Sequence, residues 1–330
     1  ETHLAFKKAV ERARKGKGPS LIQSDVVRLL PHSSSDDQRK YRPEKDLESD
    51  RKRDPLLTFA NTCIAEGIAK QEDFDKIRDM VKSQVDEDAD WAEAQADPIS
   101  GDGQKNVYFD ADWQNDPGPN PTRGEKIVLV DAINHALDEE LTHNAKMMVY
   151  GQDVAGGKGG VFTATRGLTD KYGEDRVFNS PLAESSIIGT AIGLATLGYK
   201  PVVEIQFGDY IWYSMMQIRN EVATMRYRSN GKWSCPIVMR VPVGGYIHGS
   251  LCHSQCIDGF FTHLPGIYIA YPSNASDTKG LLKMACRMDD PVMFMEHKGL
   301  YRQGFAASPE PDENYLLPFG KARIVQEGND

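Results

Sequence analysis

The chain contains 330 residues with a mass of 36.8 kDa, of which 40% are hydrophobic and 26% are charged. This composition excludes a wholly disordered or fibrous protein. The formal net charge of −9 disfavours a nucleic-acid binder, because such proteins use Lys and Arg to neutralise phosphates. Five cysteines are too few for a disulfide framework, which favours a reducing compartment. No run of about 20 apolar residues predicts a membrane span.

Residues 1–88 are polar and mainly helical in pattern. Amphipathic periodicity predicts three helices and one short strand or strand–helix pair in this region. The helices are expected over Leu4–Lys15, Asp54–Glu66 and Gln71–Val85, and the strand over Ser20–Leu30.

Residues 89–124 form a linker in which acidic residues, Pro and Gly dominate. The segment also carries aromatic residues, which we expect to pack onto a surface: Trp91, Tyr108, Phe109 and Trp113. The chain starts within a helical pattern, and Gly320–Asp330 resembles a strand entering a turn. We therefore expect a piece of a longer protein.

Residues 125–306 alternate predicted strands with predicted helices, which is typical of a doubly wound, mostly parallel α/β sheet. The strands are expected over Met147–Tyr150, Val177–Asn179, Pro201–Ile205, Ile237–Val241, Ile267–Tyr271 and Val292–Met295. The helices are expected over Val128–Leu141, Ser185–Leu197, Trp212–Arg226 and Asp277–Met288. Residues 307–330 would begin a further domain.

Two glycine-rich segments resemble phosphate loops but lack the required context. Gly101-Asp-Gly103 does not follow an apolar strand, and we interpret it as a flexible turn. Gly156–Gly160 fails the Walker pattern because Gly159 stands where Ser or Thr should bind Mg²⁺. We interpret it as a loop that needs backbone freedom.

A cluster of His248, Cys252, His253 and Cys256 could be read as a zinc site. Structural zinc ligands usually come as separated pairs, so a turn with small buried cysteines is the favoured interpretation. A third interpretation is that one of these histidines does chemistry.

Polar residues follow the predicted strands, where open parallel sheets bind ligands. Pro181-Leu-Ala-Glu184 places a carboxylate before an apolar helix, and Glu204–Ile211 ends another strand with Gln, Phe and Tyr. The glycine-rich stretch Pro242–Gln255 supplies His253. Within residues 1–88, His32 lies among Ser and Asp residues. These residues could cap the next helix, or they could orient His32 as an acid or base.

These motifs resemble the thiamine-diphosphate-dependent 2-oxo acid dehydrogenases, the E1 components of the branched-chain and pyruvate complexes. The resemblance rests on Pro-Leu-x-Glu at 181–184, Gly-Gly-x-x-x-Gly-x-x-x-His-Ser-Gln at 244–255 and Glu296–Arg302. It implies a C-terminal part of an E1 α-like region over 1–88, joined through the linker to a β-type pyrimidine-binding domain over 125–306. Two further segments, His32–Asp37 and Glu204–Tyr210, are more similar to the branched-chain enzymes.

The resemblance implies a role for each site residue. Glu184 would hydrogen-bond N1′ of the cofactor's aminopyrimidine and so promote loss of the C2 proton. Gln206, Phe207 and Tyr210 would line the cofactor and substrate. His253 and His32 would face the reacting carbon and transfer protons. Ser33 matches a serine that kinases phosphorylate in mitochondrial members of the family.

The resemblance also implies cofactors and partners. Thiamine diphosphate and Mg²⁺ would be held mainly by the family's Gly-Asp-Gly…Asn motif, which Gly101-Asp-Gly103 does not match because it stands in the wrong place. K⁺ could bind near Asp289, where the chain is one residue shorter than the family. The partners would be a lipoylated E2 acyltransferase and further E1 subunits, in a homodimer or an α2β2-like assembly, without nucleic acid or membrane.

Several functions are expected from the resemblance. Oxidative decarboxylation of branched-chain 2-oxo acids such as 2-oxoisovalerate in a bacterial cytoplasm comes first, with a mitochondrial matrix as the less favoured location. A pyruvate or acetoin dehydrogenase E1 is the alternative within the class, and a non-catalytic docking piece is the alternative outside it.

Overall fold

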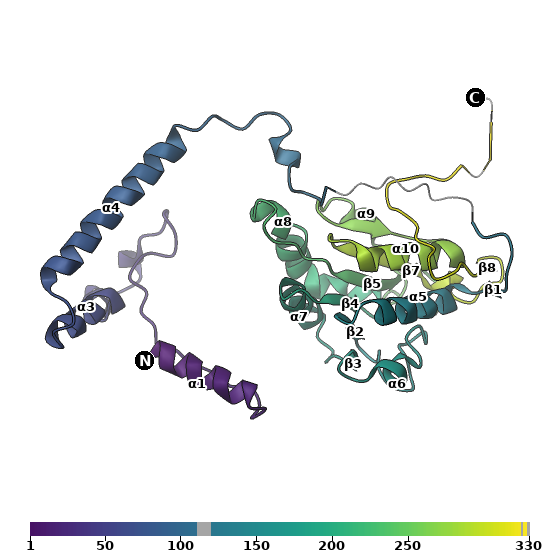
Figure 1. Cartoon of the computed structure of the whole chain (residues 1–330), viewed down its shortest axis with the longest axis horizontal. Helices are drawn as coiled ribbons and strands as arrows, with labels where there is room; N and C mark the ends of the chain where they lie inside the picture. Colours follow the sequence, from purple (N-terminus) through teal and green to yellow (C-terminus); the bar gives the residue numbers. More distant parts are fainter. Residues whose placement is uncertain (111–119, 325, 329–330) are drawn as a thin grey trace. The chain divides into compact units, whose positions relative to one another are not determined.

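A computed structural model describes residues 1–110, 120–324 and 326–328 of the chain. It divides the chain into two compact units, Glu1–Pro98 and Ile99–Asp330, each of which is described by itself (Figure 1). No helix in the described residues is both long and apolar enough to cross a bilayer.

The first unit consists of helices joined by irregular segments. Its elements are α1 (Thr2–Arg14), the 3₁₀ turn η1 (Gln38–Lys40), α2 (Glu44–Lys52), α3 (Pro55–Ala65) and α4 (Gln71–Glu93). Helix α3 begins where the Asp54 carboxylate accepts the N–H of Leu56 at 2.9 Å, with Pro55 in the first turn. Helix α4 was expected to end at Val85 but continues to Glu93, supported by surface pairs such as Lys82–Asp86.

The strand predicted over Ser20–Leu30 is wrong, because this segment forms neither strand nor helix. Its apolar side chains are largely in solvent, with Leu21 98% and Val26 79% exposed. A strand gains stability only by pairing with a neighbour, and the described part of the first unit offers none. Helix α2 was not predicted, because its sequence is almost entirely charged and buries only Leu47.

The second unit is built on a six-stranded sheet in which all neighbouring strands are parallel, in the order β3-β2-β4-β5-β7-β6. This confirms the expected α/β fold. The strands are β2 (Met147–Gly151), β3 (Val177–Asn179), β4 (Lys200–Glu204), β5 (Val238–Val243), β6 (Tyr268–Ala270) and β7 (Val292–His297). Each strand predicted within residues 125–306 is present, because apolar runs of this length are buried on both faces of a parallel sheet.

Helices cover both faces of the sheet, and alternate strand residues pack against them. On one face, Val149, Val202 and Val292 pack with α5 (Leu129–His143) and α10 (Ala275–Arg287). On the other face, Tyr150, Val203 and Met293 pack with α7 (Glu184–Thr196) and the turns η3 (Gly208–Ser214) and η4 (Gln217–Val222). The short helices of this unit are α6 (Leu168–Tyr172), α8 (Met225–Arg228) and α9 (Asp258–Phe261), with turns η2 (Asp102–Gln104) and η5 (Lys298–Leu300).

The prediction of one continuous helix over Trp212–Arg226 is wrong. The segment divides into the 3₁₀ turn η3, the π-helical turn η4 and α8. The Ala223 N–H donates to the Ile218 carbonyl at 2.9 Å, five residues back, which is the π-helical spacing that interrupts the regular helix. Turns of the π type are frequent near functional sites.

Two short strands, one before and one after the six-stranded sheet in the sequence, pair with each other. β1 (Lys126–Ile127) pairs antiparallel with β8 (Ser308–Pro309). The strand predicted within Gly320–Asp330 is absent from the described residues 320–324 and 326–328. The segment after β8 is held instead at Glu310, whose carboxylate accepts a hydrogen bond of 2.8 Å from Nζ of Lys279.

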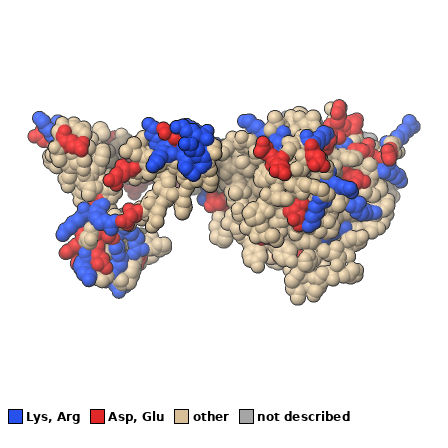
Figure 2. Space-filling view, turned by 90° about the horizontal axis from the view of Figure 1, so that it is seen from below, with Lys and Arg blue, Asp and Glu red and all other residues tan. Residues whose placement is uncertain are grey.

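Part of the predicted linker packs onto the second unit, as expected for Tyr108 and Phe109. Tyr108 lies against Tyr268 of β6 with ring centroids 4.8 Å apart, and the Phe109 N–H donates to the Asp290 carboxylate at 2.7 Å. Trp91 differs from the expectation, since it lies on α4 with 67% of its surface exposed. Trp113 lies outside the described residues. Figure 2 shows that charges of both signs mix on the surface of this unit, beside a broad area without charged side chains.

Candidate active site at the carboxyl edge of the sheet

Glu184 is placed by the turn that follows β3, as the first residue of α7. Its side chain is half-buried, and its Oε1 atom accepts a hydrogen bond of 3.0 Å from Nε2 of Gln152. Gln152 is buried and directly follows β2, the strand next to β3. Two adjacent strand ends thus fix one carboxyl oxygen and leave the other to serve a ligand.

An aromatic cluster lies at the end of β4. The ring of Phe207 is 4.6 Å from that of His253 and 6.0 Å from that of Tyr210, both edge to face. Phe162 adds a further edge-to-face contact with Phe207 at 5.9 Å. These contacts combine residues that are far apart in the sequence into one apolar surface with polar tips.

Tyr210 and His253 share a hydrogen bond of 3.3 Å between the phenol oxygen and Nε2. Nδ1 of His253 lies 3.3 Å from the carbonyl of Gly249, which can only accept, so Nδ1 carries the proton in the neutral ring. Desolvation raises the pKa of the Tyr210 phenol, and nearby Cys252, Asp209 and Glu184 raise it further. The Glu184 carboxylate thus contributes to the negative electrostatic surroundings of the Tyr210 phenol.

The loop that carries His253 depends on glycine at two positions. Gly244 has a φ of +79°, and a Cβ added there would lie 2.5 Å from Nε2 of His297. At Gly249 a Cβ would lie 2.6 Å from Nδ1 of His253. Of the three glycines quoted for the family resemblance, Gly244 is thus favoured by its backbone conformation and by close packing, and Gly249 by close packing alone.

Gln206 lies on the same strand end but faces away from this cluster. Its Nε2 atom donates to Oδ2 of Asp153 at 3.4 Å, and Asp153 pairs with Lys158. The hydrogen bond from Lys158 lowers the pKa of the Asp153 carboxyl. The interpretation of the Gly156–Gly160 loop as a permissive backbone fits Gly159, where a Cβ would lie 2.3 Å from Cα of Arg166.

A buried charge network supports the strands beneath the cluster. Arg240 of β5 donates to Glu204 at 2.8 Å and to Glu296 at 2.7 and 3.0 Å. The Tyr301 hydroxyl donates to Glu296 at 2.6 Å. Burial raises the pKa of Glu204, and although burial alone would lower that of Arg240, Glu296 and Glu204 hold it above its usual value. One cation thus serves two buried carboxyl groups.

His32 and Ser33 belong to the first unit, in an exposed loop. The N–H of His32 donates to Asp36 at 2.9 Å, and Tyr41 donates to the same carboxylate at 2.6 Å. The bond from Tyr41, followed by that from His32, lowers the pKa of Asp36. The Ser33 and Ser35 hydroxyls are 3.1 Å apart. The loop is thereby held by its own carboxylate, and the roles of His32 and Ser33 stay predictions.

The segment expected to bind K⁺ uses some of its oxygens for other partners. Asp290 is 2% exposed, accepts from Phe109 and pairs with Arg226 at 3.0 Å. Nη2 of Arg226 also donates to the carbonyl of Asp289 at 3.2 Å. Arg226 therefore occupies the Asp289 carbonyl and the Asp290 carboxylate, while the exposed Asp289 side chain stays available, and a K⁺ near Asp289 stays a prediction. Asp289 and Asp290 precede β7, at the amino edge of the sheet, whereas the site lies at the carboxyl edge.

The zinc interpretation of the His248–Cys256 cluster finds no support in the described residues, where no three His, Cys, Asp or Glu side chains converge on a point suited to a metal. His253 instead bonds to Tyr210, and Cys252 and Cys256 are exposed thiols. The favoured interpretation of buried cysteines is wrong at both positions, and a chemical role for one of the histidines stays a prediction.

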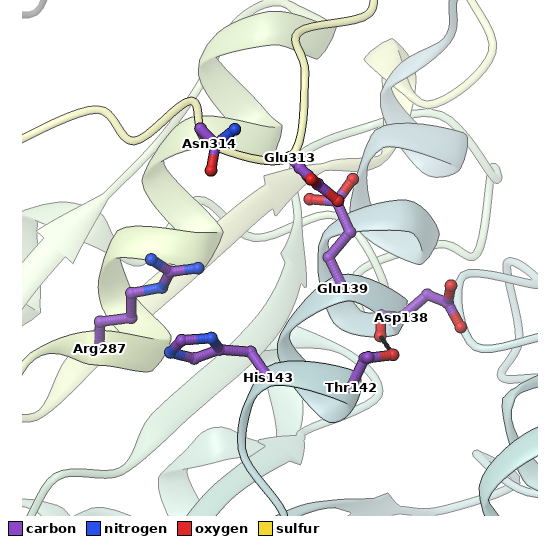
Figure 3. Close-up of a pocket in the computed structure, with 7 residues that line it drawn as sticks. All are labelled: Asp138, Glu139, Thr142, His143, Arg287, Glu313 and Asn314. Atoms are coloured by element: carbon purple, nitrogen blue, oxygen red, sulfur yellow. Dashed lines mark hydrogen bonds between the residues drawn. The ribbon is translucent and has the colours of Figure 1, made fainter.

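A separate hollow of about 480 Å³ lies between the C-terminal halves of α5 and α10 and the segment after β8 (Figure 3). Its lining residues are Asp138, Glu139, Thr142, His143, Arg287, Glu313 and Asn314. Glu139 pairs with Lys279 and Lys283 at 2.6 Å each, and Arg287 pairs with Glu140 at 2.7 Å. Its charges are thus satisfied within the fold, and its place near the amino edge separates it from the candidate site.

The fold and this site define a class. Residues 125–303 match the family described as "Transketolase, pyrimidine binding domain", and residues 1–100 match "Dehydrogenase E1 component". The chain belongs to the transketolase pyrimidine-binding-domain family, and the resemblance read from its motifs is confirmed.

Three curated relatives specify the similarity further. The chain is 50% identical over 201 residues to the 2-oxoisovalerate dehydrogenase subunit beta of Bacillus subtilis (strain 168), covering 61% of each chain. It is 43% identical over 205 residues to the pyruvate dehydrogenase E1 component subunit beta of that organism, covering 62% of each. It is 47% identical over 207 residues to the mitochondrial 2-oxoisovalerate dehydrogenase subunit beta of Dictyostelium discoideum, covering 62% of this chain and 55% of the relative. The chain thus spans about six-tenths of the length of these relatives.

Three residues of the site were missed from the sequence. Gln152 directly follows β2, and Phe162 follows the Gly156–Gly160 loop. Lys298 directly follows β7, and its Nζ atom lies 5.6 Å from the centroid of the Phe207 ring. Gln152 and Lys298 each stand directly after a buried strand, and residues at such positions in a parallel sheet are candidates for ligand binding. The same position indicated Glu184 and the residues at the end of β4.

Proposed function

We propose that this chain belongs to the E1 component of a 2-oxo acid dehydrogenase complex. It would act on branched-chain 2-oxo acids by thiamine-diphosphate-dependent oxidative decarboxylation and pass the acyl group to the lipoyl arm of an E2 partner. The observation that carries the proposal is the half-buried Glu184 carboxyl, held by Gln152 at the carboxyl edge of the sheet that also carries the cluster of Tyr210, Phe207 and His253. The 50% identity to a 2-oxoisovalerate dehydrogenase subunit supports the substrate class.

The residues present fit the pyrimidine end of the cofactor. An aminopyrimidine offers ring nitrogens to a carboxyl group and an aromatic face to an apolar surface, which Glu184 and Phe207 provide. When bound, thiamine diphosphate would supply the nucleophilic carbon and the electron sink for decarboxylation. Neither the diphosphate nor Mg²⁺ has a binding motif in this sequence, so that end of the cofactor would be held by other protein.

Each side chain would contribute to proton transfer or exclusion of water. Glu184 would hold a proton on its second oxygen and exchange it with the pyrimidine nitrogen, while Gln152 keeps the first oxygen oriented. His253 would accept or donate a proton at Nε2, where Tyr210 now bonds. Phe207 and Phe162 would keep water from the reacting groups, which strengthens the electrostatic interactions there.

His32 would join the site as a second proton carrier, and phosphorylation of Ser33 would add negative charge beside it and repel an anionic substrate. Gln206 would act on the cofactor only if it left Asp153. We further propose an assembly with other E1 subunits in a bacterial cytoplasm, in line with the Bacillus relatives. Pyruvate is the second candidate substrate, favoured by the 43% identity to a pyruvate dehydrogenase subunit.

The test compares the intact natural protein with its Glu184→Gln variant in the presence of thiamine diphosphate and Mg²⁺. Decarboxylation of 2-oxoisovalerate and of pyruvate would be followed with an artificial electron acceptor, and exchange of the cofactor's C2 proton would be followed by NMR. We expect turnover that favours 2-oxoisovalerate, and a loss of about 10²–10⁴-fold in both readouts for the variant.

The matched control is Glu221→Gln, which removes a surface carboxylate paired with Arg228 and should leave both readouts unchanged. Near-normal C2 proton exchange in Glu184→Gln would contradict the role of Glu184. Preference for pyruvate would keep the mechanism and replace the substrate.

A further inference from the structure

Lys298 is a buried lysine at the candidate site. It begins η5 directly after β7, at the carboxyl edge of the sheet, and is 1% exposed. Its Nζ atom has no hydrogen-bond partner among the described residues and lies 5.6 Å from the centroid of the Phe207 ring. Buried polar groups in complete proteins are nearly always paired, so an unpaired ammonium here calls for an explanation.

The charge on Lys298 is not required to fold the chain. Burial lowers the pKa of Lys298 to about 8, against the opposing effect of Asp209 and Cys256, so the group still carries its proton at pH 7. A buried charge without a partner opposes folding, and an apolar side chain of similar length would fill the same volume without that penalty. Residues that weaken a fold in this way are characteristic of functional sites.

A nearby acceptor is also left without a partner. Oδ1 of Asp209 is buried and unpaired in the described structure, while Oδ2 receives the N–H of Gln255 at 3.4 Å. Asp209 and Lys298 do not form an ion pair with each other, although Asp209 influences the Lys298 ammonium. The positive charge is therefore only partly compensated by the protein, and its field can act on an anion bound at the site although the ammonium itself is buried.

Phe207 connects this charge to the catalytic candidates. Its ring contacts the Lys298 ammonium and also His253, whose ring centroid is 4.6 Å away and perpendicular. A cation near an aromatic ring is held by the ring's electrons, and this attraction strengthens when water is excluded. The ammonium therefore restrains the orientation of Phe207 from within the core.

We propose that Lys298 is a positioning residue of the site: its ammonium fixes the ring of Phe207 and supplies the positive charge that draws the carboxylate of the substrate to that ring. The identity of the anion as a 2-oxo acid rests on the proposed function. The attraction itself requires only a small apolar carboxylate and no turnover.

The experiment measures binding without reaction, by calorimetry on the intact natural protein. The probes are isovalerate and isovaleramide, which share one carbon skeleton and differ in charge. We expect wild-type protein to prefer the carboxylate by about ten-fold or more, the range set by one charged interaction. Lys298→Met should abolish this preference and leave the melting temperature unchanged or raised.

Lys200→Met is the matched control. Lys200 is also buried, with its pKa lowered to about 8 chiefly by burial, but its Nζ donates to the Met288 carbonyl at 2.7 Å at the amino edge of the sheet. This variant should lower the melting temperature and keep the carboxylate preference. The proposal is overturned if wild-type protein shows no preference, if Lys298→Met keeps it, or if Lys200→Met loses it equally. A protein that keeps the preference but decarboxylates nothing would refute the proposed function alone.

Discussion

Replacing Arg240 by Met should destabilise the α/β unit by about 3–5 kcal/mol at pH 7, the usual effect of breaking a buried ion pair. Arg240 is 1% exposed and is held by two hydrogen bonds from its guanidinium to Glu296 and one to Glu204. Methionine fills much of the same space, so the loss would come from the two carboxyl groups left without their cation.

The magnitude follows from the protons that these carboxyl groups would have to take up. Neutralising a carboxyl with an ordinary pKa near 4.3 costs about 3.7 kcal/mol at pH 7, at 1.36 kcal/mol per pH unit. Burial already raises the pKa of Glu204 in the wild-type protein, so Glu296 would contribute most of the loss. At pH 5 the same term falls to about 1 kcal/mol, so the destabilisation should shrink by about 2–3 kcal/mol.

Urea unfolding at pH 7 and pH 5, followed by tryptophan fluorescence and circular dichroism, measures this difference. Arg228→Met is the control, because the side chains of Arg228 and its partner Glu221 are 55% and 46% exposed. Removing such a surface pair should change stability by less than about 1 kcal/mol at either pH. A loss below about 1 kcal/mol for Arg240→Met, or an equal loss at both pH values, would refute the reasoning.

Two further predictions concern the segments that flank the family domain. Asp290→Ala removes the acceptor of the Phe109 N–H and should speed hydrogen exchange of that amide at least ten-fold, whereas the exposed Asp170→Ala should not; equal exchange in both variants would show that Asp290 does not hold this segment. Glu310→Gln should lower the melting temperature near neutral pH. Burial would raise the pKa of Glu310, but its bonds from Lys279 and His135 lower it overall, so its contribution is present above the unfolded pKa and is lost as the pH falls through the folded one. The difference from wild type should therefore shrink progressively in calorimetric scans as the pH falls below the ordinary carboxyl pKa, and a difference of constant size would contradict this origin.

Local sequence was sufficient for elements whose burial shows in a few consecutive residues. The runs at Met147–Tyr150 and Val292–Met295 are apolar on both sides, and only a central parallel strand buries both. Glu184 and His253 were found because each lies in a motif that places it next to a strand end. Apolar side chains at Ser20–Leu30 carried the same local signal, but a strand also needs a partner, which the segment's own sequence does not encode.

Contacts between distant segments account for what the sequence did not predict. Gln152 and Glu184 meet because β2 and β3 are neighbours, and that order depends on the whole sheet. The helix expected after Trp212 is interrupted by a π-helical turn, which the apolar periodicity of the segment does not reveal. The bond from Arg226 to the Asp289 carbonyl joins residues that lie 63 positions apart in the sequence.

The pairing of β1 with β8 brings the two ends of the pyrimidine-binding domain next to each other. Lys126 lies opposite Pro309 and Ile127 opposite Ser308, so the chain leaves the domain where it entered. A unit of this kind can be moved between genes as a cassette, since material joined before β1 or after β8 does not have to stretch across the sheet. Joining the two ends directly and opening the chain in a surface loop should consequently yield a circular permutant with the same sheet.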